Sequence, residues 1–156
     1  MIQAELRRVI LGPKEPLERS VMQVNICCDG KAEKVLDKIK EALVMILSTE
    51  SLCEDEHSFV QDSTYELMES WLDYYILQHI DEECLKEGKK RIRYFGEDRD
   101  WFWWSSRVVD ENNICVYLLL EGFPVSGFDD FKWLLKCCGA LEVEQGDVIQ
   151  PNDVKM

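Results

Sequence analysis

Residues 101–120 read WFWWSSRVVDENNICVYLLL, which is two strand-forming segments joined by the polar run Asp110-Glu111-Asn112-Asn113. Aromatic and β-branched residues favour strands, and a cluster of Asp and Asn favours a turn. The stretch therefore predicts a β-hairpin with strands at Trp101–Val109 and Ile114–Leu120. The second strand is apolar enough to lie in the centre of a sheet.

The aromatic run at the start of this hairpin must be covered on both sides. Side chains alternate along a strand, so Trp101 and Trp103 share one face and Phe102 and Trp104 share the other. One pair can fill a core, and the other needs a helix or a partner against it. Because aromatic side chains often anchor interfaces, Trp101 and Trp103 are candidate partner-binding residues, and burial on both faces is the alternative.

The chain before the hairpin predicts three elements and a break. Met1–Leu11 is expected to be a short strand or an irregular segment, and the Gly-Pro sequence that follows it breaks the chain. Val21–Cys28 is β-branched and predicts a strand that Asp29-Gly30 ends. Lys31–Ser48 predicts an amphipathic helix. Its apolar face comprises Val35, Leu36, Ile39, Ala42, Leu43 and Ile46.

Between that helix and the hairpin, the polar residues 48–61 predict a loop. A helix is expected from Asp62 to about Glu87, and a strand over Lys89–Phe95. After the hairpin, Phe128–Cys138 predicts a helix that Gly139 ends, and Leu141–Glu144 predicts a last strand. Residues 145–156 are expected to form a loose C-terminal tail.

Together these elements predict an α+β fold in which one sheet carries its helices mainly on one face. With the helix at 62–87 treated as an acidic insertion, the order is β-α-β-β-α-β, a ferredoxin-like arrangement. The chain of 156 residues is long enough for one domain with a substantial core, which we place at residues 1–144.

The net charge of −13 is concentrated in one part of the sequence. Residues 50–87 contain 12 acidic residues and 1 basic residue. Residues 1–49, by contrast, contain 7 acidic and 8 basic residues. An acidic field of this kind repels nucleic acids and anionic membranes and attracts basic proteins. The alternative is that these charges only keep the protein soluble.

Within this segment the carboxylates form groups that a helix selected only for stability would avoid. Asp62, Glu66, Glu69 and Asp73 are spaced to form one stripe on a helix, where like charges repel. A further group, Glu54-Asp55-Glu56, is expected in the preceding loop. We therefore predict a docking surface for a basic partner, formed by the stripe and this loop group.

Enzymatic chemistry has no clear signature in the sequence. No Gly-x-Ser-x-Gly, phosphate-binding or dinucleotide-binding motif occurs, and exposed carboxylates in a regular row share one environment, unlike an acid–base pair. The only Cys/His groupings are Cys53/His57 and His79/Cys84, whose ability to bind metal the sequence leaves open. No catalytic residue, metal or cofactor is therefore predicted.

The seven cysteines are expected to be reduced and mostly buried. The sequence lacks a secretory signal and an apolar run of membrane-spanning length, so a cytoplasmic protein is expected. Lys89, Arg91 and Arg93 share one face of their predicted strand, but acidic residues flank them. Direct binding of nucleic acid is therefore not expected.

This sequence, which is acidic and combines a Trp-rich hairpin with a following short helix in a small α+β protein, resembles bacterial toxin-immunity proteins of the contact-dependent, polymorphic-toxin type. The resemblance covers residues 97–144, with the hairpin at Asp100–Leu120, and includes no diagnostic motif, so no family residue is carried over. It implies binding and neutralisation of one cognate basic toxin, such as a nuclease domain. The alternatives are an acidic nucleic-acid mimic that inhibits a DNA-binding protein, and an enzyme of undetected type.

Overall fold

The computed structural model describes residues 2–56, 95, 99–122, 125 and 127–154, with residues 49–56 described as helical backbone only. The elements in chain order are α1 (Ile2–Leu11), β1 (Val21–Cys28), α2 (Ala32–Glu56), β2 (Trp101–Asp110), β3 (Asn113–Leu120), α5 (Phe128–Cys137), β4 (Ala140–Ile149) and the short 3-10 helix η2 (Pro151–Asp153). The predicted α+β class is confirmed. From β1 to β4, the described elements follow the predicted β-α-β-β-α-β succession.

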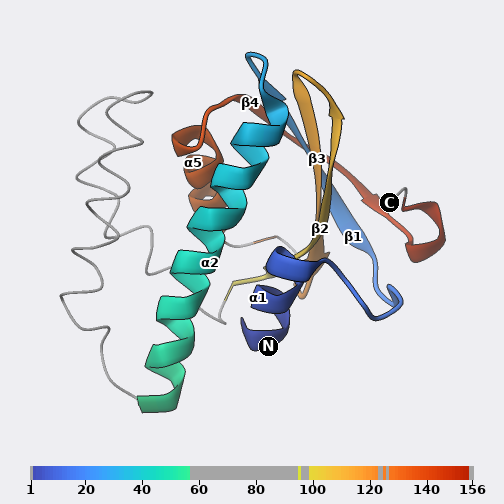
Figure 1. Ribbon diagram of the computed structural model, residues 1–156. Coiled ribbons are helices and arrows are strands. Elements are labelled where there is room, and N and C mark those ends of the chain that lie inside the picture. The colour runs from blue at the N-terminus through green and yellow to red at the C-terminus, as the bar shows by residue number, and fades with distance from the viewer. Residues whose placement is uncertain (1, 57–94, 96–98, 123–124, 126, 155–156) are drawn as a thin grey trace.

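The four strands form one antiparallel sheet in the order β2-β3-β1-β4 (Figure 1). The predicted hairpin is present as β2 and β3, and its turn brings Asp110 opposite Asn113. The Asp110 carboxylate accepts hydrogen bonds from the Asn112 backbone and the Asn113 side chain, which explains why this polar run turns. β3 lies between β2 and β1, as its apolar sequence predicts.

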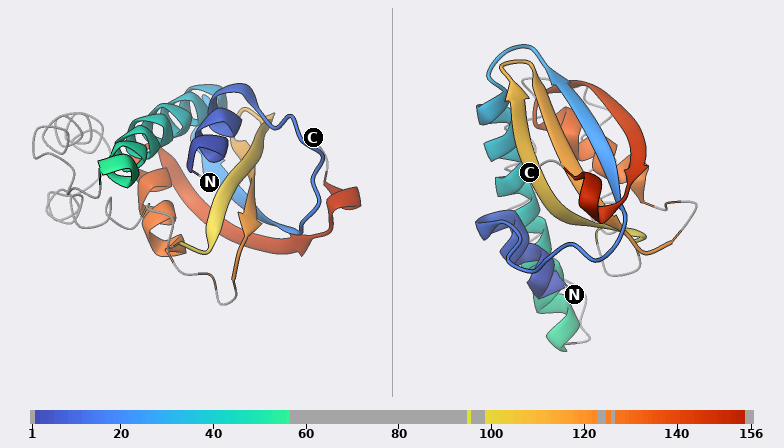
Figure 2. Two further views of the ribbon diagram at one scale, coloured as in Figure 1. Left: turned by 90° about the horizontal axis from the view of Figure 1, so that it is seen from below. Right: turned by 90° about the vertical axis from the view of Figure 1, so that its right-hand side faces the viewer.

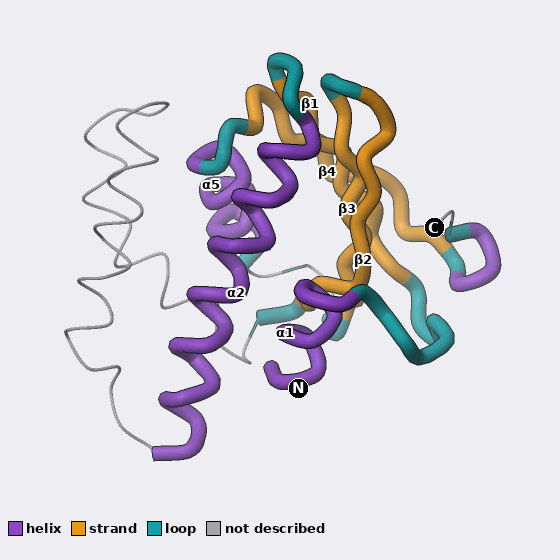
Figure 3. Tube along the Cα trace, in the orientation of Figure 1, coloured by secondary structure: helices purple, strands orange, loops and turns teal. Residues whose placement is uncertain are grey.

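The helices pack on one face of this sheet (Figures 2 and 3). The main core lies between this face and α1, α2 and α5; at its centre, Ile39 and Leu43 of α2 and Leu134 of α5 are fully buried. A smaller cluster on the opposite face contains Trp104 and Tyr117. That cluster is covered by Leu17, before β1, and Val154, after η2. In the described residues, the helices therefore lie mainly on one face of the sheet, as predicted.

The first eleven residues are helical, which corrects the prediction of a strand or an irregular segment. The buried residues of α1 include Ile2, Glu5 and Val9, whose spacing of three and four residues is that of a helix. The apolar residues Ile2, Leu6 and Val9 have the same spacing in the sequence, and Glu5 is fully buried beside them although it is charged.

The loop predicted over residues 48–61 is also wrong where the structure describes it. α2 continues to Glu56, so Glu54, Asp55 and Glu56 belong to the last turns of a helix of 25 residues. Polarity suggested a loop there, but Glu and Leu are good helix formers and no Gly or Pro interrupts the run.

The last strand is longer than the predicted Leu141–Glu144. β4 begins at Ala140 and ends at Ile149, so the first part of the expected loose tail continues the sheet, and η2 follows it. The pairing with β1 has an irregularity between Gln145 and Val148, just beyond the predicted end of the strand. It interrupts the regular alternation by which a strand is recognised.

The expected helix Asp62–Glu87 lies outside the described residues, as does the expected strand Lys89–Phe95 except for Phe95. Phe95 is fully buried in the main core and belongs to a 3-10 turn. None of the helices in the described ranges is both long enough and apolar enough to cross a bilayer.

Candidate interaction surface

Trp101 and Trp103, predicted at a partner interface, are core residues instead. Their exposed fractions are 0% and 1%. The Trp101 ring lies 4.5 Å from that of Phe131 in α5 and 5.7 Å from that of Phe95, centroid to centroid. The helices cover this face of β2 at Trp101 and Trp103, so these two indoles stabilise the fold and are not available to a partner.

On the other face of β2, Trp104 is buried as well. This agrees with the alternative prediction, in which the aromatic residues are buried on both faces of the strand. β2 has an irregular register between Trp103 and Ser105, so Trp104 is the extra residue of a bulge. The guanidinium carbon of Arg8 lies 5.5 Å from the centre of the Trp104 ring. A helical residue thus contributes to the cover of this face.

The outer edge of β2 is closed by side chains of α1. The Glu5 carboxylate accepts a hydrogen bond of 2.7 Å from the backbone N–H of Trp103, and Arg8 Nε donates one of 2.8 Å to the Trp103 carbonyl oxygen. These two side chains take the place that a neighbouring strand would occupy. A further strand cannot add at this point without displacing α1.

The outer edge of β4 is different, because within the described part of the chain this strand pairs with β1 alone. Leu141 and Val148 have exposed fractions of 60% and 49%. Glu142, Glu144 and Asp147 are exposed too, and no basic residue occurs in 140–154. An unpaired row of backbone N–H and C=O groups therefore runs beside carboxylates.

Glu142, Glu144 and Asp147 lie outside the binding surface that the sequence predicts. The alternation Leu141-Glu142-Val143-Glu144 is visible in the sequence and identifies a strand with charge on one side. Whether that strand is central or at an edge depends on strand order, which no local pattern reveals. The alternating pattern is visible in the sequence, but only the strand order shows that this strand lies at an edge of the sheet.

Of the predicted acidic surface, the structure describes only the start. Glu54, Asp55 and Glu56 lie at the end of α2, where the helix dipole disfavours negative charge and the last turn has no basic residue. Asp62, Glu66, Glu69 and Asp73 lie outside the described residues. Of the candidate metal ligands, only Cys53 lies within a described element, α2, and His57, His79 and Cys84 lie outside.

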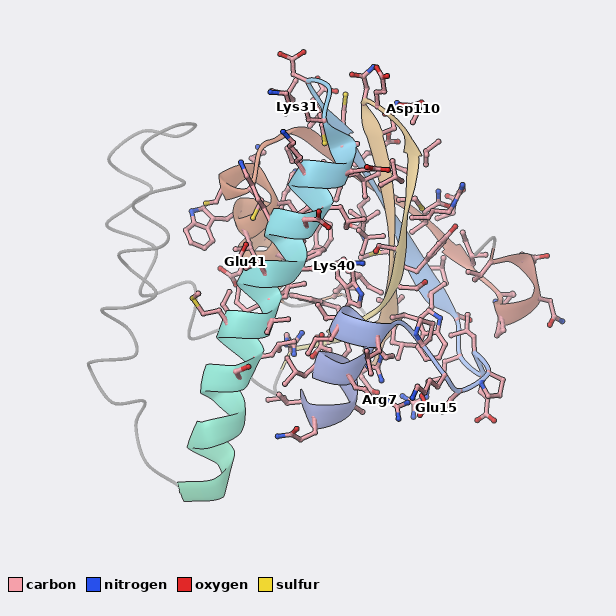
Figure 4. The ribbon with its side chains drawn as sticks, in the orientation of Figure 1. Arg7, Glu15, Lys31, Lys40, Glu41 and Asp110 are labelled. Atoms are coloured by element: carbon pink, nitrogen blue, oxygen red, sulfur yellow. The ribbon has the colours of Figure 1, made fainter. Side chains whose placement is uncertain are left out.

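An open pocket of about 660 Å³ lies where the start of α2 meets the β2–β3 turn. Lys31 and Lys34 contribute positive charge to it, and Glu33, Asp110 and Glu111 contribute negative charge. Lys31 and Asp110 lie at the same end of the molecule in Figure 4. Opposite charges are thus mixed around this pocket, and it selects neither cations nor anions.

Two of the described thiols, those of Cys28 and Cys138, are poorly suited to nucleophilic chemistry. Burial raises the pKa of the Cys138 thiol, and burial followed by the charge of neighbouring Cys27 raises that of Cys28. A raised pKa lowers the thiolate fraction at neutral pH, and the thiolate is the reactive form. The described residues also contain no group of three or more His, Cys, Asp or Glu arranged to hold a metal ion.

No family model matches this chain, and comparisons with curated proteins and with solved structures find no match either.

Proposed function

We propose that this protein is a non-catalytic binding protein of the bacterial cytoplasm, an immunity protein that binds and neutralises one cognate basic toxin domain. We further propose that the toxin domain is a nuclease. The protein needs no cofactor in this role. Its own contribution is a rigid α+β framework that presents carboxylates to the partner.

The observation that supports this proposal most is a change of charge within one helix. Residues 32–49 of α2 contain three acidic and three basic residues, whereas residues 50–56 contain four acidic residues and no basic one. This acidic end of α2 extends beyond the sheet (Figures 1 and 2). The acidic run of the sequence, 50–87, thus begins at a projecting end of the framework.

Such a distribution suits a small and strongly basic partner. Opposite potentials accelerate the encounter of two proteins, and the acceleration declines as salt screens the charges. The same field disfavours nucleic acids and anionic membranes. A nuclease domain has the required chemistry, because its substrate groove must attract a polyanion.

In the proposed mechanism, the carboxylates occupy the groove in which the toxin binds nucleic-acid phosphates. Asp62, Glu66, Glu69 and Asp73 act there as a decoy for the phosphate backbone. Inhibition then needs no covalent chemistry, since the occupied groove cannot take up its substrate. Tight binding requires apolar and hydrogen-bonded contacts in addition, because exposed charge pairs contribute little affinity individually.

The test is a pull-down with tagged protein from nuclease-treated lysate of the native host, washed at low and at moderate salt. We expect one basic protein, captured in stoichiometric amount and retained at moderate salt. Adding the purified chain should abolish that protein's toxic activity at a molar ratio near one. A captured protein whose activity is unchanged would contradict the immunity role.

The other outcomes separate the alternatives. Several DNA-binding proteins that are all released by moderate salt would favour the nucleic-acid mimic. Capture of no protein at all would contradict both binding functions. Titration of the thiols and a zinc assay on Cys53, His57, His79 and Cys84 would then test for undetected enzymatic or metal chemistry.

A further inference from the structure

The two edges of the sheet differ in whether another strand can join them. At the β2 edge, Glu5 and Arg8 of α1 hydrogen-bond to both backbone groups of Trp103. At the β4 edge, no described segment takes a corresponding position. β4 extends over ten residues, and Leu141 and Val148, near its two ends, are exposed. Among the described residues, the sheet therefore has one edge that is closed at Trp103 and one edge that is open.

We propose that the open edge of β4 binds an extended basic segment of the partner, which adds to the sheet as a fifth strand. The proposal rests on the proposed function, because it identifies the surface by which a basic partner docks. Backbone hydrogen bonds would supply affinity in this mode, and alternate side chains would supply specificity.

The charge pattern on β4 defines the sequence that fits. Glu142 is paired with Cys27 and Glu144 with Asn25, residues on the side of β1 that faces away from α2 and α5. The two carboxylates are thus two residues apart on one face of the edge. A strand that places Lys or Arg at every second position would oppose both of them.

The face of β4 on the side of the helices determines which residues fit between the basic positions of the partner strand. Val143 is half-buried against the main core, on the side of the helices. An apolar residue between two basic ones would extend this contact and cover part of Val143. The matching partner segment therefore alternates basic and apolar residues.

A second copy of this chain fits the same edge less well. Pairing β4 with another β4 would bring together Glu142, Glu144 and Asp147 of both copies, with no basic residue in 140–154 to offset them. Like charges facing each other across strands are destabilising.

The test is an NMR titration of the full-length chain, isotope-labelled, at low salt. The probe is a short, end-blocked peptide in which lysine alternates with valine, and the control peptide has glutamate in place of lysine. We expect chemical-shift changes and slower amide exchange confined to β4 and the adjoining part of β1. The control peptide should produce neither.

The variant that tests the charges is Glu142→Lys/Glu144→Lys, and its matched control is Asp37→Lys/Glu41→Lys on the exposed side of α2. Both variants change the net charge equally and alter only exposed residues. We expect the β4 variant to weaken peptide binding at least ~10-fold and the control to weaken it much less, because only the former places lysine beside the bound strand.

Three results would overturn the proposal. They are chemical-shift changes centred away from β4, equal losses of peptide affinity in the two variants, and a longer rotational correlation time showing that β4 pairs with a second copy. The partner protein separates this proposal from the proposed function. If that protein binds wild type and Glu142→Lys/Glu144→Lys equally well, the edge proposal fails and the function stands. If the host yields no basic partner but the peptide still adds to β4, the function fails and the edge proposal stands.

Discussion

Glu5 and Arg99 are 94 residues apart in the chain and form an ion pair in which neither side chain is exposed. Both terminal nitrogens of the Arg99 guanidinium donate hydrogen bonds to the Glu5 carboxylate, and the distance from Nη1 to Oε1 is 2.8 Å. Arg99 also lies over the rings of Trp101 and Phe102, at 4.6 and 4.7 Å from their centres. This pair joins α1 to the segment before β2 and thereby holds the β2 edge closed.

Replacing Arg99 by Met should destabilise the fold by about 3–5 kcal/mol, because it leaves the Glu5 carboxylate buried without its cation. Urea unfolding followed by circular dichroism measures this loss. The double variant Glu5→Leu/Arg99→Met removes both charges and should recover part of it. Equal stability of the single and double variants would contradict a contribution from the unpaired charge.

The exposed pair of Arg7 and Glu15 provides the matched control (Figure 4). Arg7 Nη2 and Glu15 Oε1 are 2.6 Å apart, but the two side chains are 40% and 59% exposed, so screening by solvent reduces the contribution of the pair. Arg7→Ala should change the free energy of unfolding by less than about 1 kcal/mol.

Gly139→Ala should destabilise the protein by about 2–3 kcal/mol. Gly139 ends α5 with φ +113°, and a Cβ there would lie 3.3 Å from Val35 Cγ2. Gly12 ends α1 with φ +79° and has no atom within 4 Å of the same position, so Gly12→Ala should cost only about 1 kcal/mol. Thermal or urea unfolding of both variants checks the order, and a larger loss at Gly12 would contradict the argument.

Stability should fall as the pH rises above about 9, because burial raises the pKa of the Cys138 thiol above 9.0. The unfolded chain loses this proton near its ordinary pKa, whereas the folded chain keeps it. Unfolding therefore releases a proton at alkaline pH, and the free energy of unfolding declines by up to about 1.4 kcal/mol per pH unit for one thiol.

Burial also raises the pKa values of Cys28 and Tyr117, which adds to the decline in the same direction. Urea unfolding at several pH values from about 7 to 10, with a phosphine reductant, measures the slope. Cys138→Ala should make the slope shallower. An unchanged slope in that variant would assign the alkaline loss to other groups.

The triple substitution Glu66→Ala/Glu69→Ala/Asp73→Ala should slow association with the basic partner and flatten its dependence on salt, because it removes three charges from the proposed docking surface. Stopped-flow mixing at two ionic strengths measures both effects. The control is Glu33→Ala/Asp37→Ala/Glu41→Ala, which removes three exposed carboxylates from α2 at a similar helical spacing. Equal effects of the two triples would show that only net charge matters.

The local patterns of the sequence determined the elements in which burial follows a regular period. The strand of β1, the first part of α2, the β2–β3 hairpin and α5 were all predicted, because alternating or 3.6-residue apolar patterns reflect one buried face. The turn at Asp110 and the end of α5 at Gly139 followed from local backbone chemistry. The acidic excess at 50–87 was also a property of the sequence alone.

What only the tertiary structure decided depends on contacts between distant residues. Glu5 is buried in α1 because Arg99 and the Trp103 backbone compensate its charge, and no local pattern predicts that burial. Trp101 and Trp103 lie in the core because α5 and α1 cover them, and the order of the strands leaves β4 at an open edge while α1 closes β2. Strand order and helix coverage set which surfaces meet solvent, and no local spacing encodes either.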